Sequence, residues 1–197
     1  MSAAIEVMNE HGLDKVSLRA IATRLDIRQP GLYHHFASKA DLLDAVADEI
    51  LDRWHTDRLP EGDERWDEFV ARNARSLRRA MLSVRDGARL IASVGSRSPR
   101  LDNAIAQLAL LENAGFSGPE AVLALIAVSR YAIGSAVEQQ TARDRGDIVI
   151  NTDRTDAAAS HLIEIARQVV ALGQDHEFEI GLAALLRGLA PTAPGVR

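Results

Sequence analysis

The 197-residue sequence contains no cysteine and only six prolines, and aromatic residues make up just 4% of it. The absence of cysteine excludes a disulfide scaffold and a thiolate metal site, and it suits a reducing cytoplasm. The longest apolar run, Ala121–Val128, is far shorter than the ~20 residues that span a bilayer, and no signal-peptide pattern opens the chain. Few prolines and long stretches of 3.6-residue periodicity predict an all-α protein of the cytoplasm, with no membrane partner.

Lysine is also scarce, with Lys15 and Lys39 as the only two among 23 basic residues. The net charge of −5 is unusual for a protein that binds nucleic acid. The window 15–39, however, contains five basic residues and one acidic residue, a local charge of +4. A phosphate senses charge within a Debye length of ~8 Å, so this local patch decides whether the chain attracts DNA.

The same window has the pattern of two short helices joined by a tight turn. Leu18, Ile21, Ala22 and Leu25 recur at i, i+3, i+4 and i+7, which predicts one buried helical face. Ser17 precedes them in the position of an N-cap. This spacing predicts a helix that begins directly after Ser17.

The turn and the next helix follow from residues with special backbone preferences. Asp26, in the turn Leu25-Asp26-Ile27, is one of the few non-glycine residues that tolerate a left-handed backbone. Pro30 suits the first turn of a helix. Ser38 and Asp41 form a capping box that starts a further helix. The residues expected to point into a small core are Ile27, Leu32 and Phe36. Those left on the opposite face are Gln29, Gly31, Tyr33, His34 and His35.

The sequence QPGLYHHFASK, residues 29–39, resembles the recognition helix of the tetracycline-repressor (TetR) family of bacterial transcription regulators. The stretches 42–55, 66–90 and 115–140 are similar to the ligand-binding domain of the tetracycline repressors themselves. The resemblance implies a three-helix helix-turn-helix DNA-binding domain over 1–45, joined by a long helix to a helical ligand-binding and dimerisation domain over 46–197. It also implies a homodimer that binds double-stranded operator DNA and a small-molecule effector, and represses transcription.

Arg28 and Gln29 open the recognition helix, where arginine can bind guanine and glutamine can bind adenine in the major groove. The resemblance implies further DNA contacts from Arg19, Pro30, Gly31, Tyr33, His34 and Lys39. A packing role for Tyr33 and a solvated surface charge for Lys39 are the alternatives. His35 serves equally well as a partly buried spacer.

Beyond the DNA-binding domain the periodicity predicts a second, helical domain. Helices are expected from Ser38 to Asp57, from the cap Asp63, over Leu101–Ala114 after Ser98-Pro99, from Ser117 to Thr141, and from Asp156 and Asp175, with a mobile loop over Arg143–Thr155. Small residues of the helix 117–141 (Ala132, Gly134, Ser135, Ala136) and apolar residues of the last helix (Phe178, Ile180, Leu182, Leu185, Leu186, Leu189) suit a dimer interface. Ordinary packing within one chain is the alternative for both sets.

The resemblance implies effector contacts from His55, Asn73, Gln107 and Glu138, of which Glu138 would act through water on a drug-bound Mg²⁺. Leu77 replaces an aromatic residue of the drug site, and Ile91 replaces a histidine that binds the metal. Isoleucine offers no ligand to Mg²⁺. We therefore expect these six positions to line an apolar pocket that binds a different, polycyclic or polyketide-like molecule without metal or other cofactor. Each polar residue taken alone is more commonly a surface or satisfied core residue.

Two other functions were weighed against this interpretation. An enzyme is disfavoured, because the sequence has no H-E-x-x-H, G-x-S-x-G, P-loop or dinucleotide-binding fingerprint. The other is a ligand-blind DNA-binding protein, or an activator, of the same fold. The long second domain argues against a ligand-blind protein.

Overall fold

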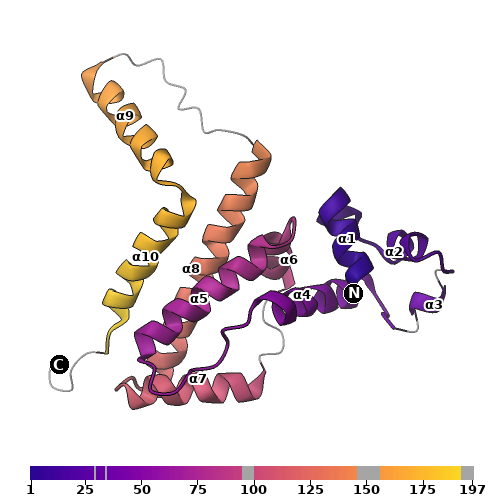
Figure 1. The fold of residues 1–197 in the computed structure, drawn as a ribbon, viewed down its shortest axis with the longest axis horizontal. Helices are drawn as coiled ribbons and strands as arrows, with labels where there is room; N and C mark the ends of the chain where they lie inside the picture. The colour runs from indigo at the N-terminus through magenta and orange to yellow at the C-terminus, as the bar shows by residue number, and fades with distance from the viewer. Residues whose placement is uncertain (29, 34, 95–99, 146–155, 192–197) are drawn as a thin grey trace.

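The computed structural model describes residues 1–28, 30–33, 35–94, 100–145 and 156–191. Within these ranges all regular structure is helical, as the periodicity predicts. The elements are α1 (Ser2–His11), the short 3-10 helix η1 (Leu13–Lys15), α2 (Leu18–Arg24), α3 (Pro30–Tyr33), α4 (Lys39–Trp54), α5 (Trp66–Leu82), α6 (Gly87–Val94), α7 (Leu101–Asn113), α8 (Gly118–Arg145), α9 (Ala157–Leu172) and α10 (Gln174–Leu189). Figure 1 shows α1, α2 and α3 at one end and the longer helices at the other, with α4 between them.

The caps of the N-terminal helices are those that the sequence predicts. The Ser17 hydroxyl accepts a hydrogen bond from the backbone N–H of Ala20 at 3.1 Å, and Ser38 accepts one from the N–H of Asp41 at 3.1 Å. Asp26 has a φ of 53°, the left-handed conformation expected in the turn. These local interactions confirm the predicted starts of α2 and α4.

The core of the N-terminal domain differs from the prediction at two residues. Buried side chains from its helices include Ile5, Met8, Leu18, Ile21, Ala22, Leu32, Leu42 and Val46. The prediction that Leu25 and Ile27 are buried is wrong, since they are 49% and 47% exposed. α2 ends at Arg24, so both residues lie in the turn rather than on the buried face of a helix.

α4 links the two parts of the chain. It buries Leu42, Val46 and Ile50 and packs against α5 and α6. The helix ends at Trp54, three residues earlier than predicted, and the N–H of His55 makes its last helical hydrogen bond. One continuous helix therefore runs from the DNA-binding domain to the beginning of the segment that leads to α5.

α8 is the central helix of the larger domain. By length and composition it could cross a membrane, but it packs against α5, α6, α7 and α10 as a core helix does. It buries Ala121, Ala132 and Ala136 completely, and such small side chains let the neighbouring helices approach closely. Ala132 and Ala136, predicted for a dimer interface, thus belong to the core of the single chain. Gly134 lies between them on an exposed face.

Two further helix boundaries differ from the prediction, and one predicted cap lies outside the described residues. Arg65 rather than Asp63 precedes α5, because the Glu68 carboxylate accepts a hydrogen bond from the Arg65 N–H at 3.2 Å. α8 continues to Arg145, so the first three residues of the predicted loop are helical. The rest of that loop lies outside the described residues, as does the predicted cap Ser98.

α9 and α10 complete the chain. Asp156 caps α9 as predicted, accepting hydrogen bonds from the N–H groups of Ala158 and Ala159. α9 has no buried residue and extends away from the other helices in Figure 1. α10 buries Phe178 and Leu182 against the chain, whereas its Ile180 is 60% exposed. Both helices therefore keep apolar surface that this chain alone does not cover.

Candidate DNA-binding and effector-binding sites

The predicted recognition helix is the short helix α3, which begins at Pro30 and ends at Tyr33. Gly31 is exposed in it, and a Cβ atom added there would meet no other atom within 4 Å. The backbone of α3 is therefore open to a close partner at this position. Gln29 and His34, predicted to contact DNA, lie outside the described residues.

Four cationic side chains are exposed around the helix-turn-helix: Lys15, Arg19, Arg28 and Lys39. Lys15 and Arg19 also form part of the wall of an open groove of about 640 Å³ between α1 and α2. The predicted charge of +4 also counted Arg24, which is not available to DNA. Its guanidinium binds the Glu10 carboxylate through two hydrogen bonds of 2.6 and 2.7 Å and also contacts Glu6. In the part of the chain that the structure describes, no carboxylate pairs with these four cations, so they are the candidates to contact DNA phosphates.

His55 follows the last residue of α4 and faces α5. Its Nδ1 lies 3.1 Å from the Ser76 hydroxyl. Burial and, to a smaller extent, the positive charge of Arg58 lower the pKa of His55 to about 4. The imidazole is therefore neutral near pH 7, and its Nε2 is the ring nitrogen left for a ligand, as a donor or an acceptor according to the tautomer.

Two more predicted effector residues hold the segment that follows His55. The Asn73 side-chain amide on α5 donates to the carbonyl of Asp57 at 2.8 Å. The Gln107 amide on α7 donates to the carbonyl of Arg58 at 2.8 Å. His55, Asn73 and Gln107 thus meet at one place, as the resemblance implies, and in this structure their polar groups bind protein.

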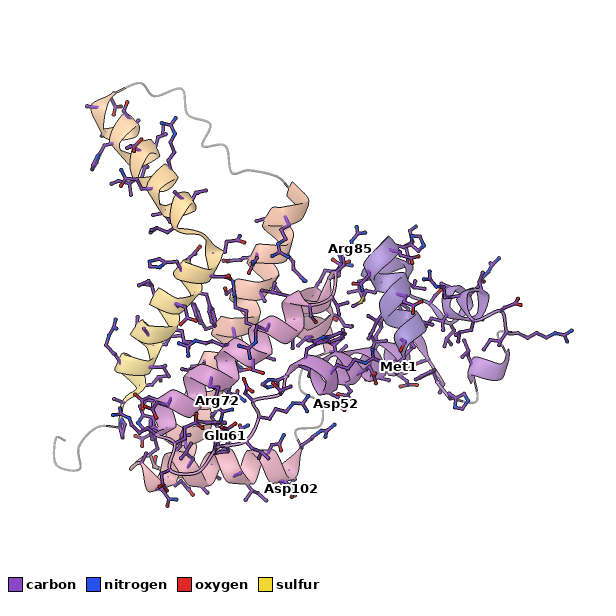
Figure 2. All side chains as sticks on the ribbon, in the orientation of Figure 1. Met1, Asp52, Glu61, Arg72, Arg85 and Asp102 are labelled. Atoms are coloured by element: carbon purple, nitrogen blue, oxygen red, sulfur yellow. The ribbon has the colours of Figure 1, made fainter. Side chains whose placement is uncertain are left out.

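Arg72 of α5 binds the same connecting segment (residues 55–65) further along. It donates to the Glu64 carboxylate at 2.8 and 2.7 Å and to the carbonyl of Leu59 at 2.9 Å. Figure 2 shows Arg72 beside Glu61, and their charged groups lie 3.2 Å apart. Hydrogen bonding from Arg72 lowers the pKa of Glu64, so this pair stays ionised at neutral pH.

The remaining three predicted effector residues lie outside this hydrogen-bonded group. Leu77 is partly buried and packs against the core. Ile91 on α6 is buried, with 6% of its surface exposed. Glu138 is exposed on α8. Burial and the charge of Glu177 raise the pKa of Tyr131, and the charge of Glu138 makes a smaller contribution in the same direction. Among the described hydrogen bonds, none joins Glu138 to His55, Asn73 or Gln107.

The residues present do not fit a magnesium ion. Ile91 presents only hydrocarbon, whereas Mg²⁺ takes mostly oxygen ligands in octahedral geometry. In the part of the chain that the structure describes, no group of three or more histidine, aspartate or glutamate side chains could hold a metal ion. The donors that do converge are amides, a hydroxyl and a neutral imidazole.

Sequence reasoning missed Ser76 and Arg58 in this group. Ser76 lies three residues after Asn73 on α5, so helical spacing places both on one face and would have identified it. The Ser76 hydroxyl also accepts a hydrogen bond from the backbone N–H of Asp57 at 3.2 Å. Arg58 lies in a non-helical segment, where no periodicity marks a residue as buried.

The larger domain contacts the DNA-binding domain through the turn before α6. Asp86, with a φ of 58°, accepts a hydrogen bond from the N–H of Leu13 at 2.7 Å. The N–H of Arg85 donates to the Asn9 side chain at 2.9 Å, and its guanidinium donates to the carbonyl of Glu10 at 3.2 Å. Figure 2 shows Arg85 next to α1.

Gln140 of α8 holds the same turn from the other side. Its amide donates to the carbonyls of Val84 and Met81 at 2.8 and 3.2 Å, and its oxygen accepts the N–H of Ala88 at 3.0 Å. The Gln140 side chain thus satisfies backbone groups at the end of α5 and at the start of α6. The turn between α5 and α6 is therefore hydrogen-bonded both to α8 and to α1 and η1.

Comparison with known proteins agrees with this architecture. Residues 1–46 match the family described as "Bacterial regulatory proteins, tetR family", and residues 59–193 match "Tetracyclin repressor-like, C-terminal domain". The chain is 40% identical over 193 residues to the tetracycline repressor protein class A from transposon 1721 of Escherichia coli. The aligned region covers 95% of this chain and 87% of that protein.

Two solved structures are also similar. One is a TetR variant from Acinetobacter baumannii AYE in complex with minocycline, with a TM-score of 0.85 and 36% identity over 100% of this chain and 96% of that one. The other is BioQ with its double-stranded DNA operator, with a TM-score of 0.67 and 28% identity over 96% and 94% of the two chains. On its sequence and on its fold, the chain belongs to the TetR family of bacterial regulatory proteins.

Proposed function

We propose that this protein is a ligand-responsive transcriptional repressor, which binds a palindromic operator as a homodimer and is released by a small-molecule effector. The similar structures with minocycline and with an operator support both kinds of ligand. The observation that carries the proposal is the meeting of His55, Asn73 and Gln107 at one end of α4, whose other end lies in the DNA-binding domain.

The geometry supports a direct coupling between the two sites. An effector that uses the amides of Asn73 and Gln107 must replace their bonds to the carbonyls of Asp57 and Arg58. Those bonds hold the segment that leaves α4, so effector binding frees the C-terminal end of that helix. α4 has 16 residues and a length of about 24 Å, so a small tilt at one end displaces the other. The effector needs only a few kcal/mol of preference for the tilted conformation to empty the operator.

A second copy of the chain accounts for the uncovered apolar surface. α9 exposes the large side chains Leu162, Ile165, Val169, Val170 and Leu172. Ile180 extends this surface onto α10. Two copies related by a two-fold axis would present two recognition helices, which matches the two half-sites of a palindrome, about 34 Å or one turn of DNA apart.

The polar group at His55 supports an effector that binds without metal, through hydrogen bonds and apolar contact with residues such as Leu77 and Ile91. We assign the protein no enzymatic activity, since its relatives are regulators. We place it in the cytoplasm, where the bacterial chromosome is. We also retain the division into residues 1–45 and 46–197, with the boundary inside α4.

A two-step experiment tests this function. Random DNA is first selected with the purified protein, and the palindrome obtained is used in a fluorescence anisotropy assay. Arg28→Ala should weaken binding at least about tenfold and reduce its salt dependence, whereas Arg65→Ala, at a side chain that is 70% exposed just before α5, should have little effect. Equal loss in both variants would contradict the assigned DNA-binding face.

The second step is a thermal-shift screen of small molecules, including tetracyclines with and without Mg²⁺. A ligand at a hundredfold excess over its Kd stabilises the protein by about 2.7 kcal/mol. We expect a metal-independent hit that releases the operator, and we expect His55→Ala to weaken release while leaving operator affinity unchanged. A shift that requires Mg²⁺ would contradict our interpretation of Ile91. Operator binding that no compound affects would favour the ligand-blind alternative.

A further inference from the structure

The lysines of the chain lie only in its DNA-binding domain. Of the 23 lysine and arginine residues, only Lys15 and Lys39 are lysines, and residues 40–197 contain none. The two residue types differ in reactivity. The guanidinium of arginine stays protonated in proteins, whereas the lysine amine can lose its proton, act as a nucleophile and be acylated. Lysine chemistry is therefore restricted to the part of the molecule that is assigned to DNA.

Both lysine side chains are accessible. Lys15 and Lys39 are exposed, and among the described residues neither forms an ion pair with a carboxylate. Asp14, which precedes Lys15, is bound by Arg89 of α6 instead. An exposed amine that no carboxylate holds is open to a dissolved reagent as well as to a DNA phosphate.

The surroundings of the two lysines are cationic. Residues 15–39 have a net charge of +4, and this remains +2 when Glu6 and Glu10, which bind Arg24, are counted with them. Lys15 and Arg19 both line the open groove of about 640 Å³ between α1 and α2. A positively charged surface with a groove raises the local concentration of small anions. Acyl phosphates are activated acyl donors that are also small anions, so this surface concentrates them beside the two amines.

We propose that Lys15 and Lys39 are acylation sites for acyl phosphates, and that their acylation weakens operator binding. The neutral Nζ attacks the acyl carbon, and a C–N amide bond forms while the C–O bond to phosphate breaks. Phosphate leaves with the electron pair of that bond, and the nitrogen releases a proton to water. Each acylation removes one positive charge and one phosphate-binding group. The inference rests on the proposed function, because its consequence is a loss of operator affinity.

Acylation at these lysines acts separately from the effector. Lys39 is the first residue of α4, whereas His55 follows the last one. The 16 residues of the helix place about 24 Å between its two ends. Lys15 lies in η1, before α2. An acyl group on either lysine therefore changes the DNA-binding surface and leaves the contacts of His55, Asn73 and Gln107 in place.

The test treats the full-length dimer with acetyl phosphate. Mass spectrometry counts the acetyl groups on the intact chain and locates them in its peptides, and fluorescence anisotropy measures affinity for the selected operator. We expect both lysines to be acetylated and the Kd for the operator to rise at least about tenfold. The slope of log K against log salt should become shallower by about 3 to 4, because a dimer loses four cations. Excess operator during the treatment should protect both lysines.

Two variants serve as controls. The double variant Lys15→Arg/Lys39→Arg keeps both charges but has no lysine amine, so it should bind the operator like the wild type and keep its affinity after the treatment. Arg65→Lys places an amine outside the DNA-binding domain, at a side chain that is 70% exposed. That amine should be acetylated equally with and without operator.

Four outcomes would overturn the inference: no acetylation of either lysine, unchanged operator affinity after acetylation of both, an equal loss of affinity in the double variant, or no protection by the operator. In each of them the untreated protein still binds its operator, so the proposed function stands. An untreated protein that selects no operator would instead refute the proposed function itself.

Discussion

The partly buried imidazole of His55 makes folding stability depend on pH in a defined direction. Burial, followed by the charge of Arg58, lowers its pKa from 6.5 to about 4 in the folded chain. As the pH falls below 6.5, the unfolded chain binds a proton at His55 that the folded chain does not. The free energy of unfolding therefore falls between about pH 6.5 and pH 4, and the contribution of His55 is fully present only above that range.

The size of the effect follows from the shift. One pKa unit corresponds to about 1.4 kcal/mol, so the full shift corresponds to about 3 kcal/mol. The His55 ring is only partly covered, and solvent screening reduces this to about 2 kcal/mol. We therefore expect the wild-type protein to lose about 2 kcal/mol through this single group on acidification to pH 4.

The variant His55→Asn isolates that contribution. The asparagine amide can replace Nδ1 as a partner of the Ser76 hydroxyl, but it does not titrate. The free energy of unfolding is measured by urea titration at a fixed protein concentration, from about pH 7.5 to 4.5. Its decrease over this pH range should be smaller by about 2 kcal/mol in the variant than in the wild type. His11→Asn, at a side chain on α1 that is 61% exposed, is the control and should follow the wild type. Parallel curves for wild type and His55→Asn would refute the reasoning.

Three further predictions concern the architecture. Ser17→Ala should lower the free energy of unfolding by about 1 kcal/mol in urea titrations, because α2 loses its N-cap bond, and no change would show that the cap is dispensable. Asp86→Asn removes the charge from the acceptor that holds the Leu13 N–H, so hydrogen exchange at that amide should accelerate about tenfold while global stability changes little. An unchanged rate would mean that other contacts hold the domains together. Gly181→Ala should cost about 2 kcal/mol, because the added methyl group meets the Tyr131 hydroxyl, and the second substitution Tyr131→Leu should restore part of the loss. An additive double variant would exclude that contact as the cause.

The DNA-binding domain was the part most predictable from sequence, because its interactions are local. Ser17 and Ser38 each bond a backbone N–H three residues away, and Asp26 sets the turn by its own backbone preference. Helical spacing failed only at the turn. There Leu25 and Ile27 continue the apolar pattern after the helix has ended, and both are exposed.

The grouping of His55, Asn73 and Gln107 was predicted from resemblance and not from any local pattern. His55 and Ser76 are 21 residues apart, and Gln107 and Arg58 are 49 apart. No periodicity connects such positions, and Arg58 has no helical context that would predict its burial. The separate helix α6, which begins after the left-handed Asp86, also depends on contacts with α8 and the DNA-binding domain.

By itself the sequence determined the helical class, the helix-turn-helix, its caps and the apolar faces, since each depends on residues within one or two helical turns. Only the tertiary structure decided that Arg24 is neutralised by Glu6 and Glu10, and that the Nη2 atom of Arg58 is covered without a hydrogen-bond partner among the described residues. The physical reason is that burial and charge pairing are set by residues distant in sequence. Whether a polar side chain contacts water, protein or a ligand is therefore decided by how the helices pack.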